Sequence, residues 1–134
     1  MFYVMSAEQR LSIAKAQLYA AELASACDGL HELGFVHCDL KLENILVDEE
    51  GHTMLADFGF TQRLHKPGDG EEENVPKGHT LCYTPPEVLN GAEVGPSTDW
   101  WGVGCLIYEY HHGLPPFYHQ SERKMTRAIM RAVS

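Results

Sequence analysis

The chain has 134 residues, 44% of them hydrophobic, and a formal net charge of −9 at pH 7. This length suits a single domain, and the negative charge argues against nucleic acid as the main partner, because phosphate backbones bind basic surfaces. No apolar run approaches the roughly 18 residues of a membrane span, and the four cysteines are spaced too widely for a secreted disulfide framework. We therefore expect a soluble, intracellular protein of the cytoplasm, without a membrane or nucleic-acid partner.

The first half of the chain is predicted to contain one long helix and a short β-hairpin. Ser12 can cap a helix that extends to about Leu33, with Gly34 in position to end it. Two strands are expected at 45–47 and 53–56, because short apolar runs flank a polar turn that contains a glycine.

The second half is predicted to begin with an irregular segment and to end in a helix. Residues 60–84 show no apolar periodicity and contain several glycines, prolines and acids, which is typical of a loop. A short helix follows at 86–89. A last amphipathic helix is expected to begin at Ser121, with Val133 among its apolar residues.

A second long helix is expected between these segments, from Asp99 to His112. Ser97 or Thr98 can cap it. Its residues are apolar nearly all round, which is typical of a helix at the buried centre of a helical domain. The predicted fold class is therefore α+β and mainly α, with a small hairpin that carries polar residues.

The most informative segment is 37–59, in which two of the acids, an amide and a lysine stand at the spacing that phosphoryl transfer needs. Phosphoryl transfer needs a carboxylate that accepts the proton of the acceptor hydroxyl, and oxygen ligands that hold Mg2+ against the phosphates. Asp39 suits the first task, and Asn44 and Asp57 suit the second, because Mg2+ prefers oxygen ligands. Lys41 supplies a point charge close to the transferred group.

Four motifs occur in order along the chain: HCDLKLEN, DFG, PPE and DWWGVG. One such tripeptide is weak support for a family, whereas four in register are strong. With these motifs the chain resembles the C-terminal lobe of a eukaryotic protein kinase, over residues 1–134, from the helix after the hinge to the helix that follows the central one. The resemblance implies a mainly helical lobe whose β-hairpin carries the catalytic and metal-binding loops, with the N-terminal lobe absent. Lys41 and the stretches 18–22, 57–60 and 99–102 are most similar to serine/threonine kinases of the AGC group.

The resemblance implies roles for four groups of residues. The residues implied in catalysis are Asp39 and Lys41. Those implied in binding ATP are Lys41, Glu43, Asn44, Leu46 and Asp57, of which Asn44 and Asp57 would hold Mg2+. Those implied in binding the protein substrate are Glu43, Glu109 and Thr84, and those that would support the site are His37, Phe58, Gly59, Glu87 and Asp99.

Several of these residues also have a plain structural interpretation. Leu46, implied to lie under the adenine ring, is equally acceptable as a core leucine, and the implied stacking pair of His37 and Phe58 would suit any core. Glu43 and Glu109 match acids that read arginines in AGC kinases, which implies a substrate with basic residues before the acceptor Ser or Thr. Glu109 can instead be a solvated carboxylate at a helix end. Asp99 is implied to accept backbone N–H groups of the catalytic turn, since a buried aspartate needs such partners.

The chain departs from the family at both ends. It contains no Gly-rich loop, no strand lysine for the nucleotide phosphates and no partner glutamate, all of which belong to the N-terminal lobe. The arginine that would pair with Glu87 falls beyond residue 134, so Glu87 is expected to be unpaired. We therefore expect a truncated kinase domain that needs the missing lobe or a partner protein.

The chain also departs from the family beside the catalytic base and in the following loop. Cys38 replaces the arginine that clamps a phosphorylated loop residue, so activity is not expected to depend on phosphorylation of Thr80, which aligns with the usual phosphosite. Residues 79–87 are about four residues short, a deletion that removes up to about 14 Å of extended chain. Thr84 is the candidate to replace the threonine that contacts the catalytic aspartate and lysine in the family.

Two functions remain open from the sequence. The first is a serine/threonine protein kinase, whose catalytic set of Asp39, Lys41, Asn44 and Asp57 is intact, although the truncated chain is expected to be weak or inactive alone. The second is a non-catalytic, kinase-like module for docking or regulation, which the missing lobe and the shortened loop favour.

Overall fold

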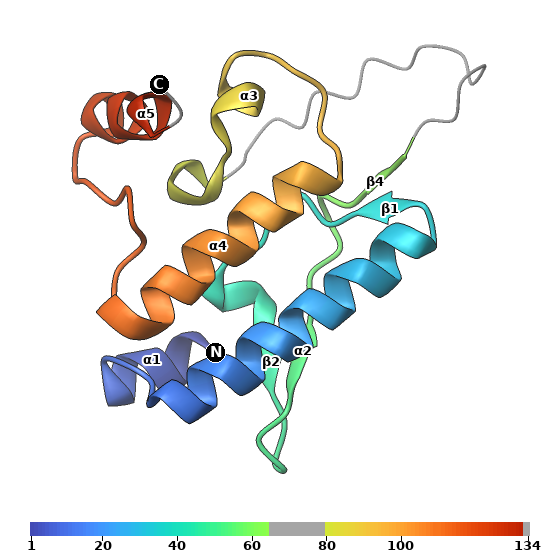
Figure 1. The fold of residues 1–134 in the computed structure, drawn as a ribbon, viewed down its shortest axis with the longest axis vertical. Helices are drawn as coiled ribbons and strands as arrows, with labels where there is room; N and C mark the ends of the chain where they lie inside the picture. The colour runs from blue at the N-terminus through green and yellow to red at the C-terminus, as the bar shows by residue number, and fades with distance from the viewer. Residues whose placement is uncertain (65–79, 133–134) are drawn as a thin grey trace.

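The computed structural model describes residues 1–64 and 80–132. The described elements, in chain order, are α1 (Phe2–Glu8), α2 (Ile13–Glu32), β1 (Phe35–Val36), η1 (Leu42–Asn44), β2 (Ile45–Val47), β3 (Thr53–Leu55), β4 (Gln62–Arg63), η2 (Leu81–Tyr83), α3 (Pro86–Leu89), α4 (Pro96–His112) and α5 (Glu122–Arg131) (Figure 1). This part of the chain is mainly helical, as predicted, and has two small antiparallel sheets, one more than the predicted hairpin. No helix within it is both long and apolar enough to cross a membrane.

Two long helices, α2 and α4, lie side by side and form the centre of the fold (Figure 1). Tyr19 and Leu23 of α2 pack into one core with Leu106 and Tyr110 of α4. The rings of Tyr19 and Tyr110 meet edge to face, with centroids 6.4 Å apart. Each fully buried side chain of this size contributes roughly 1.5–3 kcal/mol through removal of apolar surface from water, so this interface holds the two helices together.

The predicted bounds of α2 are confirmed. The Ser12 hydroxyl accepts a hydrogen bond from the Lys15 backbone N–H at 3.3 Å, which satisfies one of the free donors in the first turn. Leu33 is the C-terminal cap, and Gly34 follows with φ of 83°, a left-handed conformation that glycine adopts without strain.

The predicted start of α4 is wrong by three residues, because the helix begins at Pro96 rather than Asp99. Proline suits the first helical position, where its fixed φ is helical and its missing N–H would have had no partner. Thr98 therefore lies inside the first turn, and its hydroxyl accepts a hydrogen bond from the N–H of Gly95, the N-cap, at 3.2 Å.

The expected burial of α4 on nearly all sides is also wrong. Trp100 is 42% exposed and Tyr108 is 41% exposed, whereas Leu106 and Tyr110 are fully buried. One side of α4 is therefore exposed to solvent. The sequence does not reveal which side, because apolar residues occur nearly all round the helix.

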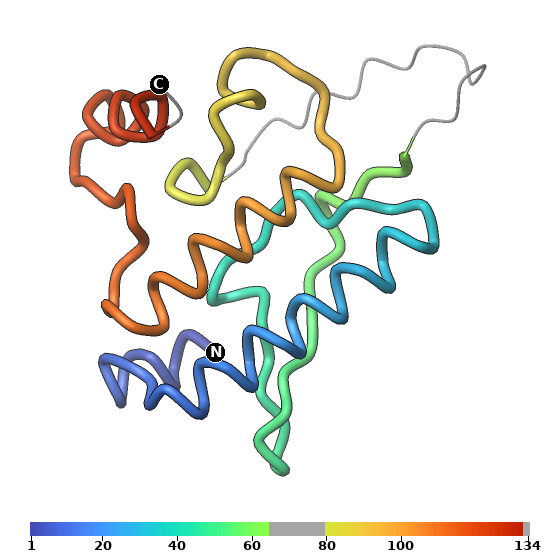
Figure 2. Tube along the Cα trace, in the orientation of Figure 1, coloured from blue at the N-terminus to red at the C-terminus, as the bar shows by residue number. Residues whose placement is uncertain are grey.

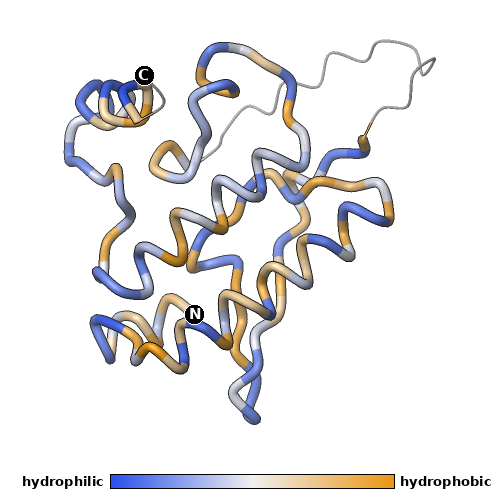
Figure 3. Tube along the Cα trace, viewed as in Figure 1, coloured by the Kyte–Doolittle hydropathy of each residue, from blue (hydrophilic) through white to orange (hydrophobic). Residues whose placement is uncertain are grey.

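The two small sheets connect the long helices to the polar loops. In the predicted hairpin, β2 pairs with β3 in antiparallel register, with Leu46 opposite Met54. The second pair, β1 with β4, places Phe35 opposite Arg63 and was not predicted, since two-residue strands carry no alternation that could be recognised. Figure 2 follows the chain from α2 through both pairs, and Figure 3 shows the hydrophilic tip of the β2–β3 hairpin.

Two further helices flank the centre. The unpredicted α1 buries Met5 in the main core, while Phe2 and Tyr3 are exposed. In α5, Met125 and Ile129 form a second cluster with η2, and Figure 3 shows hydrophobic and hydrophilic residues on opposite sides of this helix. Val133 lies outside the described residues, as do residues 65–79 of the predicted loop.

A pair of glycines on α4 provides a test of its C-terminal cap. In Gly113→Ala, the new Cβ would lie 2.6 Å from the Gln9 carbonyl oxygen at a φ of +82°. We expect a loss of more than about 1 kcal/mol in the free energy of unfolding. The control, Gly104→Ala, has no atom within 4 Å of its Cβ and should gain about 0.5–1 kcal/mol from helix propensity. Urea denaturation measures the free energy of unfolding of both variants. Equal changes in the two variants would contradict a requirement for glycine at position 113.

Candidate active site

The loop that holds the polar motif is anchored by leucines on its buried side. Leu40 and Leu42 belong to the main core, and this places the intervening Lys41 side chain toward the outside. Gly102 of α4 lies directly beneath the loop, and a Cβ at that position would be 3.0 Å from Cβ of Leu40. The absence of a side chain at Gly102 therefore lets α4 approach the loop closely.

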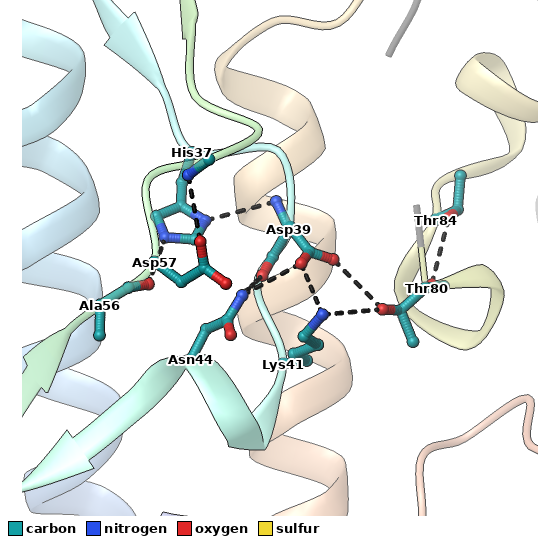
Figure 4. A network of polar contacts seen from close by, with 9 residues as sticks. His37, Asp39, Lys41, Asn44, Ala56, Asp57, Thr80 and Thr84 are labelled. Atoms are coloured by element: carbon teal, nitrogen blue, oxygen red, sulfur yellow. Dashed lines mark hydrogen bonds and ion pairs between the residues drawn. The ribbon is translucent and has the colours of Figure 1, made fainter. Parts of the chain in front are cut away.

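Asp39, Lys41 and Asn44 form one hydrogen-bonded group (Figure 4). The ammonium of Lys41 donates to Oδ2 of Asp39 at 2.6 Å, and Nδ2 of Asn44 donates to the same oxygen at 3.1 Å. Nδ2 of Asn44 also donates to the Asp39 backbone carbonyl at 2.8 Å. Both of these Asp39 oxygens need a donor, so Nδ2 and not the carbonyl oxygen of the Asn44 amide must face them. The carbonyl oxygen of Asn44 takes no part in these bonds and is available to a ligand.

Thr80 completes this group from the far side of the loop (Figure 4). Its hydroxyl donates to Oδ1 of Asp39 at 3.2 Å and lies 3.5 Å from the Lys41 ammonium. The hydroxyl of Thr84 instead donates to the backbone carbonyl of Thr80, at 3.2 Å. The contact that the sequence assigned to Thr84 is therefore made by Thr80, and Thr84 supports the backbone beneath it.

The DFG segment begins directly after β3 and remains exposed. Asp57 has a φ of 58°, and one of its carboxylate oxygens accepts from the Gly59 N–H at 3.2 Å. The Phe58 ring meets the His37 ring with centroids 5.3 Å apart, so these two side chains are in contact, although Phe58 is 52% exposed.

His37 connects this segment to the loop that carries Asp39. Its Nε2 lies 3.1 Å from the Ala56 carbonyl oxygen, and its Nδ1 lies 3.3 Å from the Asp39 N–H (Figure 4). A neutral ring protonated on Nε2 satisfies both bonds, since the carbonyl needs a donor and the N–H needs an acceptor. His37 is fully buried, so the positions of Asp39 and Asp57 depend on one another.

Asp99 holds the turn that precedes Asp39. Its carboxylate accepts from the backbone N–H groups of His37, at 2.8 Å, and Cys38, at 2.9 Å. The side chain is 1% exposed, and such a buried carboxylate needs strong donors. A third contact comes from His31 of α2, which was not anticipated because a lone histidine near a helix end carries no sequence signal of its partner.

Glu109 is buried, so its interpretation as a solvated helix-end carboxylate is wrong. It is 5% exposed and accepts a hydrogen bond from the Tyr83 hydroxyl at 2.5 Å. Burial raises the pKa of Glu109 to about 6, against a smaller opposing effect of the Tyr83 hydrogen bond. The negative charge of the exposed Glu43 raises the pKa of Glu109 further. The two carboxylates are therefore close enough for their charges to interact.

Leu46 is 49% exposed on β2, next to Met54 on β3, which is 50% exposed. Its interpretation as an ordinary core leucine is therefore wrong. Glu87 is partly buried on α3, and within residues 1–64 and 80–132 no hydrogen bond or ion pair reaches its side chain.

The donors present fit a nucleotide-bound Mg2+ better than a protein-held metal. Within the described ranges, no group of three or more His, Cys, Asp and Glu side chains could hold a metal ion. Mg2+ bound to a nucleotide takes most of its ligands from phosphates and water and needs only one or two from the protein. The carboxylate of Asp57 and the carbonyl oxygen of Asn44 are hard oxygen donors of this kind.

Comparison with known proteins shows which family the chain resembles. A family model of the protein kinase domain matches residues 1–134. The chain is 42% identical over 134 residues to Protein kinase 2 of Dictyostelium discoideum, 41% identical over 134 residues to serine/threonine-protein kinase YPK1 of Saccharomyces cerevisiae, and 40% identical over 134 residues to serine/threonine-protein kinase Sgk2 of Homo sapiens. Each alignment covers 97% of this chain.

The chain therefore belongs to the protein kinase family, and its relatives are serine/threonine kinases of the AGC group. It spans 26%, 19% and 35% of the lengths of these three relatives.

The buried Glu109 predicts an unusual dependence of stability on pH. Its pKa is about 6 in the folded chain against 4.5 for the unperturbed group, so the folded state binds a proton that the unfolded state lacks between these values. Lowering the pH from 7.5 to 4.5 should stabilise the wild type relative to Glu109→Gln by on the order of 2 kcal/mol. Chemical denaturation at several pH values measures this difference.

A second variant checks the cause of this shift. Tyr83→Phe removes the hydrogen bond that favours the charged Glu109 carboxylate. The pKa of Glu109 should therefore rise, and the stabilisation on lowering the pH should begin at a higher pH than in the wild type. A stability difference between wild type and Glu109→Gln that stays constant across the whole pH range would contradict the assignment.

Proposed function

We propose that this chain is the C-terminal lobe of a serine/threonine protein kinase, over residues 1–134. The observation that carries the proposal is the buried Asp39 carboxylate, held by Lys41, Asn44 and Thr80. Three donors fix the direction of this carboxylate, and fixed orientation is the main contribution of a protein to phosphoryl transfer.

The proposed reaction uses each of these groups in a defined way. An acceptor hydroxyl placed at Asp39 donates its proton to the carboxylate as its oxygen bonds to the γ-phosphorus of ATP, and the bond between that phosphorus and ADP breaks, so that ADP leaves. Lys41, 2.6 Å from Asp39, places positive charge beside the transferred group. Asn44 and Asp57 offer oxygen ligands to Mg2+, which neutralises phosphate charge when it is bound with ATP.

Contacts to the rest of the nucleotide are proposed along the edge of the hairpin. The exposed Leu46 is a candidate surface for the adenine ring, and the exposed Glu43, which directly precedes Asn44 in the chain, is a second candidate contact. His37, Phe58 and Gly59 would keep Asp57 in place through the contacts described above.

The proposed protein substrate carries basic residues before the acceptor Ser or Thr. Glu43 is exposed and Glu109 is buried close enough for their charges to interact, so the region favours a cation. An arginine is the best suited cation, because its planar guanidinium can bond two carboxylate oxygens at once.

A non-catalytic docking or regulatory module is the second candidate. The hydrogen bond from the Thr80 hydroxyl to Oδ1 of Asp39 does not separate it from the kinase, because a threonine contacts the catalytic aspartate in the family as well. An intact set of Asp39, Asn44 and Asp57 favours the kinase, since a docking module has no need of it.

Nucleotide binding by the chain alone tests its proposed status as one lobe. We expect only weak Mg-ATP binding and no phosphoryl transfer, because the N-terminal lobe or a partner protein would supply the contacts to the α- and β-phosphates. Isothermal calorimetry with ATP, with and without Mg2+, measures this. Micromolar binding by the isolated 134-residue chain would refute the single-lobe proposal.

Variants of the full-length protein test the roles of Asp39 and Thr80. Asp39→Asn should lower kcat by about 10²–10⁴-fold through loss of the general base. Thr80→Ser keeps a hydroxyl for Asp39 and should stay active, whereas Thr80→Val should lower kcat by about tenfold, the effect of one hydrogen bond to a charged group. Initial rates with a basic peptide measure these changes.

Two controls complete this test. Thr84→Val, which leaves the Asp39 group intact, should have a smaller effect than Thr80→Val. Phosphatase treatment should leave the wild-type rate unchanged, because Cys38 stands where an arginine would bind a phosphate. Loss of activity on dephosphorylation of Thr80 would show that activity does depend on this phosphorylation.

A further inference from the structure

We propose that Glu22 of α2 is a positioning residue for the two proposed Mg2+ ligands, Asn44 and Asp57, and that it acts through the β2–β3 hairpin. Glu22 lies outside the segment 37–59 that carries the proposed chemistry. Its effect on the hairpin stands on contacts in this structure. Only its effect on metal binding and reaction rate rests on the proposed kinase function.

The carboxylate of Glu22 is joined to the hairpin by three hydrogen bonds. Its Oε2 accepts from the Thr53 backbone N–H at 2.7 Å and from the Thr53 hydroxyl at 2.8 Å. Its Oε1 lies 2.5 Å from Nδ1 of His52, and because a carboxylate oxygen accepts, this nitrogen carries a proton. The Glu22 side chain is 21% exposed, so both of its oxygens are used by two neighbouring residues of the hairpin.

The hairpin needs this support because its own ladder is short. β2 and β3 have three residues each, and an isolated two-stranded hairpin is only marginally stable in water. One face of the hairpin is open, with Leu46 49% exposed and Met54 50% exposed, whereas Ile45 on the other face belongs to the main core. Glu22 adds a polar anchor at the opposite end of the ladder, where β3 begins at Thr53.

The base of the hairpin carries the two proposed metal ligands. Asn44 directly precedes β2, and Asp57 follows β3 after one residue, Ala56. The Ala56 N–H donates to the Asn44 backbone carbonyl at 2.9 Å. The register of β3 against β2 therefore sets where Asp57 lies relative to Asn44, and a slip of one residue would turn every side chain of the strand to the other face. The bonds from Glu22 hold the start of β3 and oppose such a slip.

Variants of Glu22 separate the hydrogen bonds from the packing. Glu22→Leu keeps a side chain of similar size and removes both acceptors. Glu22→Gln keeps the shape, since its carbonyl oxygen can accept both Thr53 bonds and its amide N–H can donate to an unprotonated Nδ1 of His52. The matched control is Glu32→Leu, because Glu32 is exposed on the same helix and, within residues 1–64 and 80–132, its side chain has no hydrogen bond or ion pair.

Amide hydrogen exchange of the 134-residue chain reads out the anchoring directly. In Glu22→Leu, the Thr53 N–H should exchange about tenfold faster, as expected for loss of a hydrogen bond to a charged group. The Ala56 N–H, at the base of the hairpin, should exchange at least about threefold faster, and the core N–H of Leu106 should keep its rate. Glu22→Gln should return both hairpin amides to within about twofold of wild type, and Glu32→Leu should leave them unchanged.

Four results would overturn the proposal. They are unchanged exchange at Thr53 in Glu22→Leu, faster exchange at Thr53 without any change at Ala56, an equal acceleration at Leu106, and failure of Glu22→Gln to restore protection. If Glu22→Leu does not fold, the wild type decides instead, since a Thr53 N–H that exchanges as fast as in an unstructured peptide would exclude its bond to Glu22.

A kinetic measurement extends the test to the proposed reaction. In the full-length protein, Glu22→Leu should raise the Mg2+ concentration for half-maximal rate about tenfold and change KM for the peptide less than twofold, since the metal ligands move while the substrate surface stays. Glu22→Gln should restore the wild-type Mg2+ dependence. Faster exchange with an unchanged Mg2+ dependence would overturn the link to the metal ligands. Faster exchange in a protein that transfers no phosphoryl group even as wild type would refute the kinase proposal and leave the hairpin-anchoring role intact.

Discussion

The buried carboxylate of Asp99 is the constraint on which the site depends. A charged group that is 1% exposed is stable only with strong donors around it, and here the donors are two backbone N–H groups and one imidazole. The same bonds hold Cys38 in a left-handed conformation. Because Asp39 comes next in the chain, the direction of its carboxylate is set from α4, far away in the sequence.

The other contacts of the site follow from this arrangement. His37, held through its backbone N–H by Asp99, uses its ring to join Asp39 to the strand end at Ala56. The DFG segment is therefore placed by the same residue that fixes the catalytic turn. Lys41 is the cation within hydrogen-bond distance of Asp39 in the described residues, so one positive charge balances the buried acid before any ligand binds.

Two threonines give the site its distinctive contacts. Thr80 donates to the Asp39 carboxylate, and Thr84 supports the Thr80 backbone. The segment between them turns Tyr83 toward Glu109, whose burial raises its pKa to about 6.

The sequence by itself determined the family, the set of acid, lysine and amide groups, and the bounds of α2, because each depends on residues close together in the chain. Ser12 and Gly34, for example, act on their own helix ends. Only the tertiary structure decided that Thr80 contacts Asp39, that His31 contacts Asp99 and that Glu109 is buried. These contacts join residues 26 to 68 positions apart, and their existence depends on how α2, α4 and the loops pack, which no local pattern encodes.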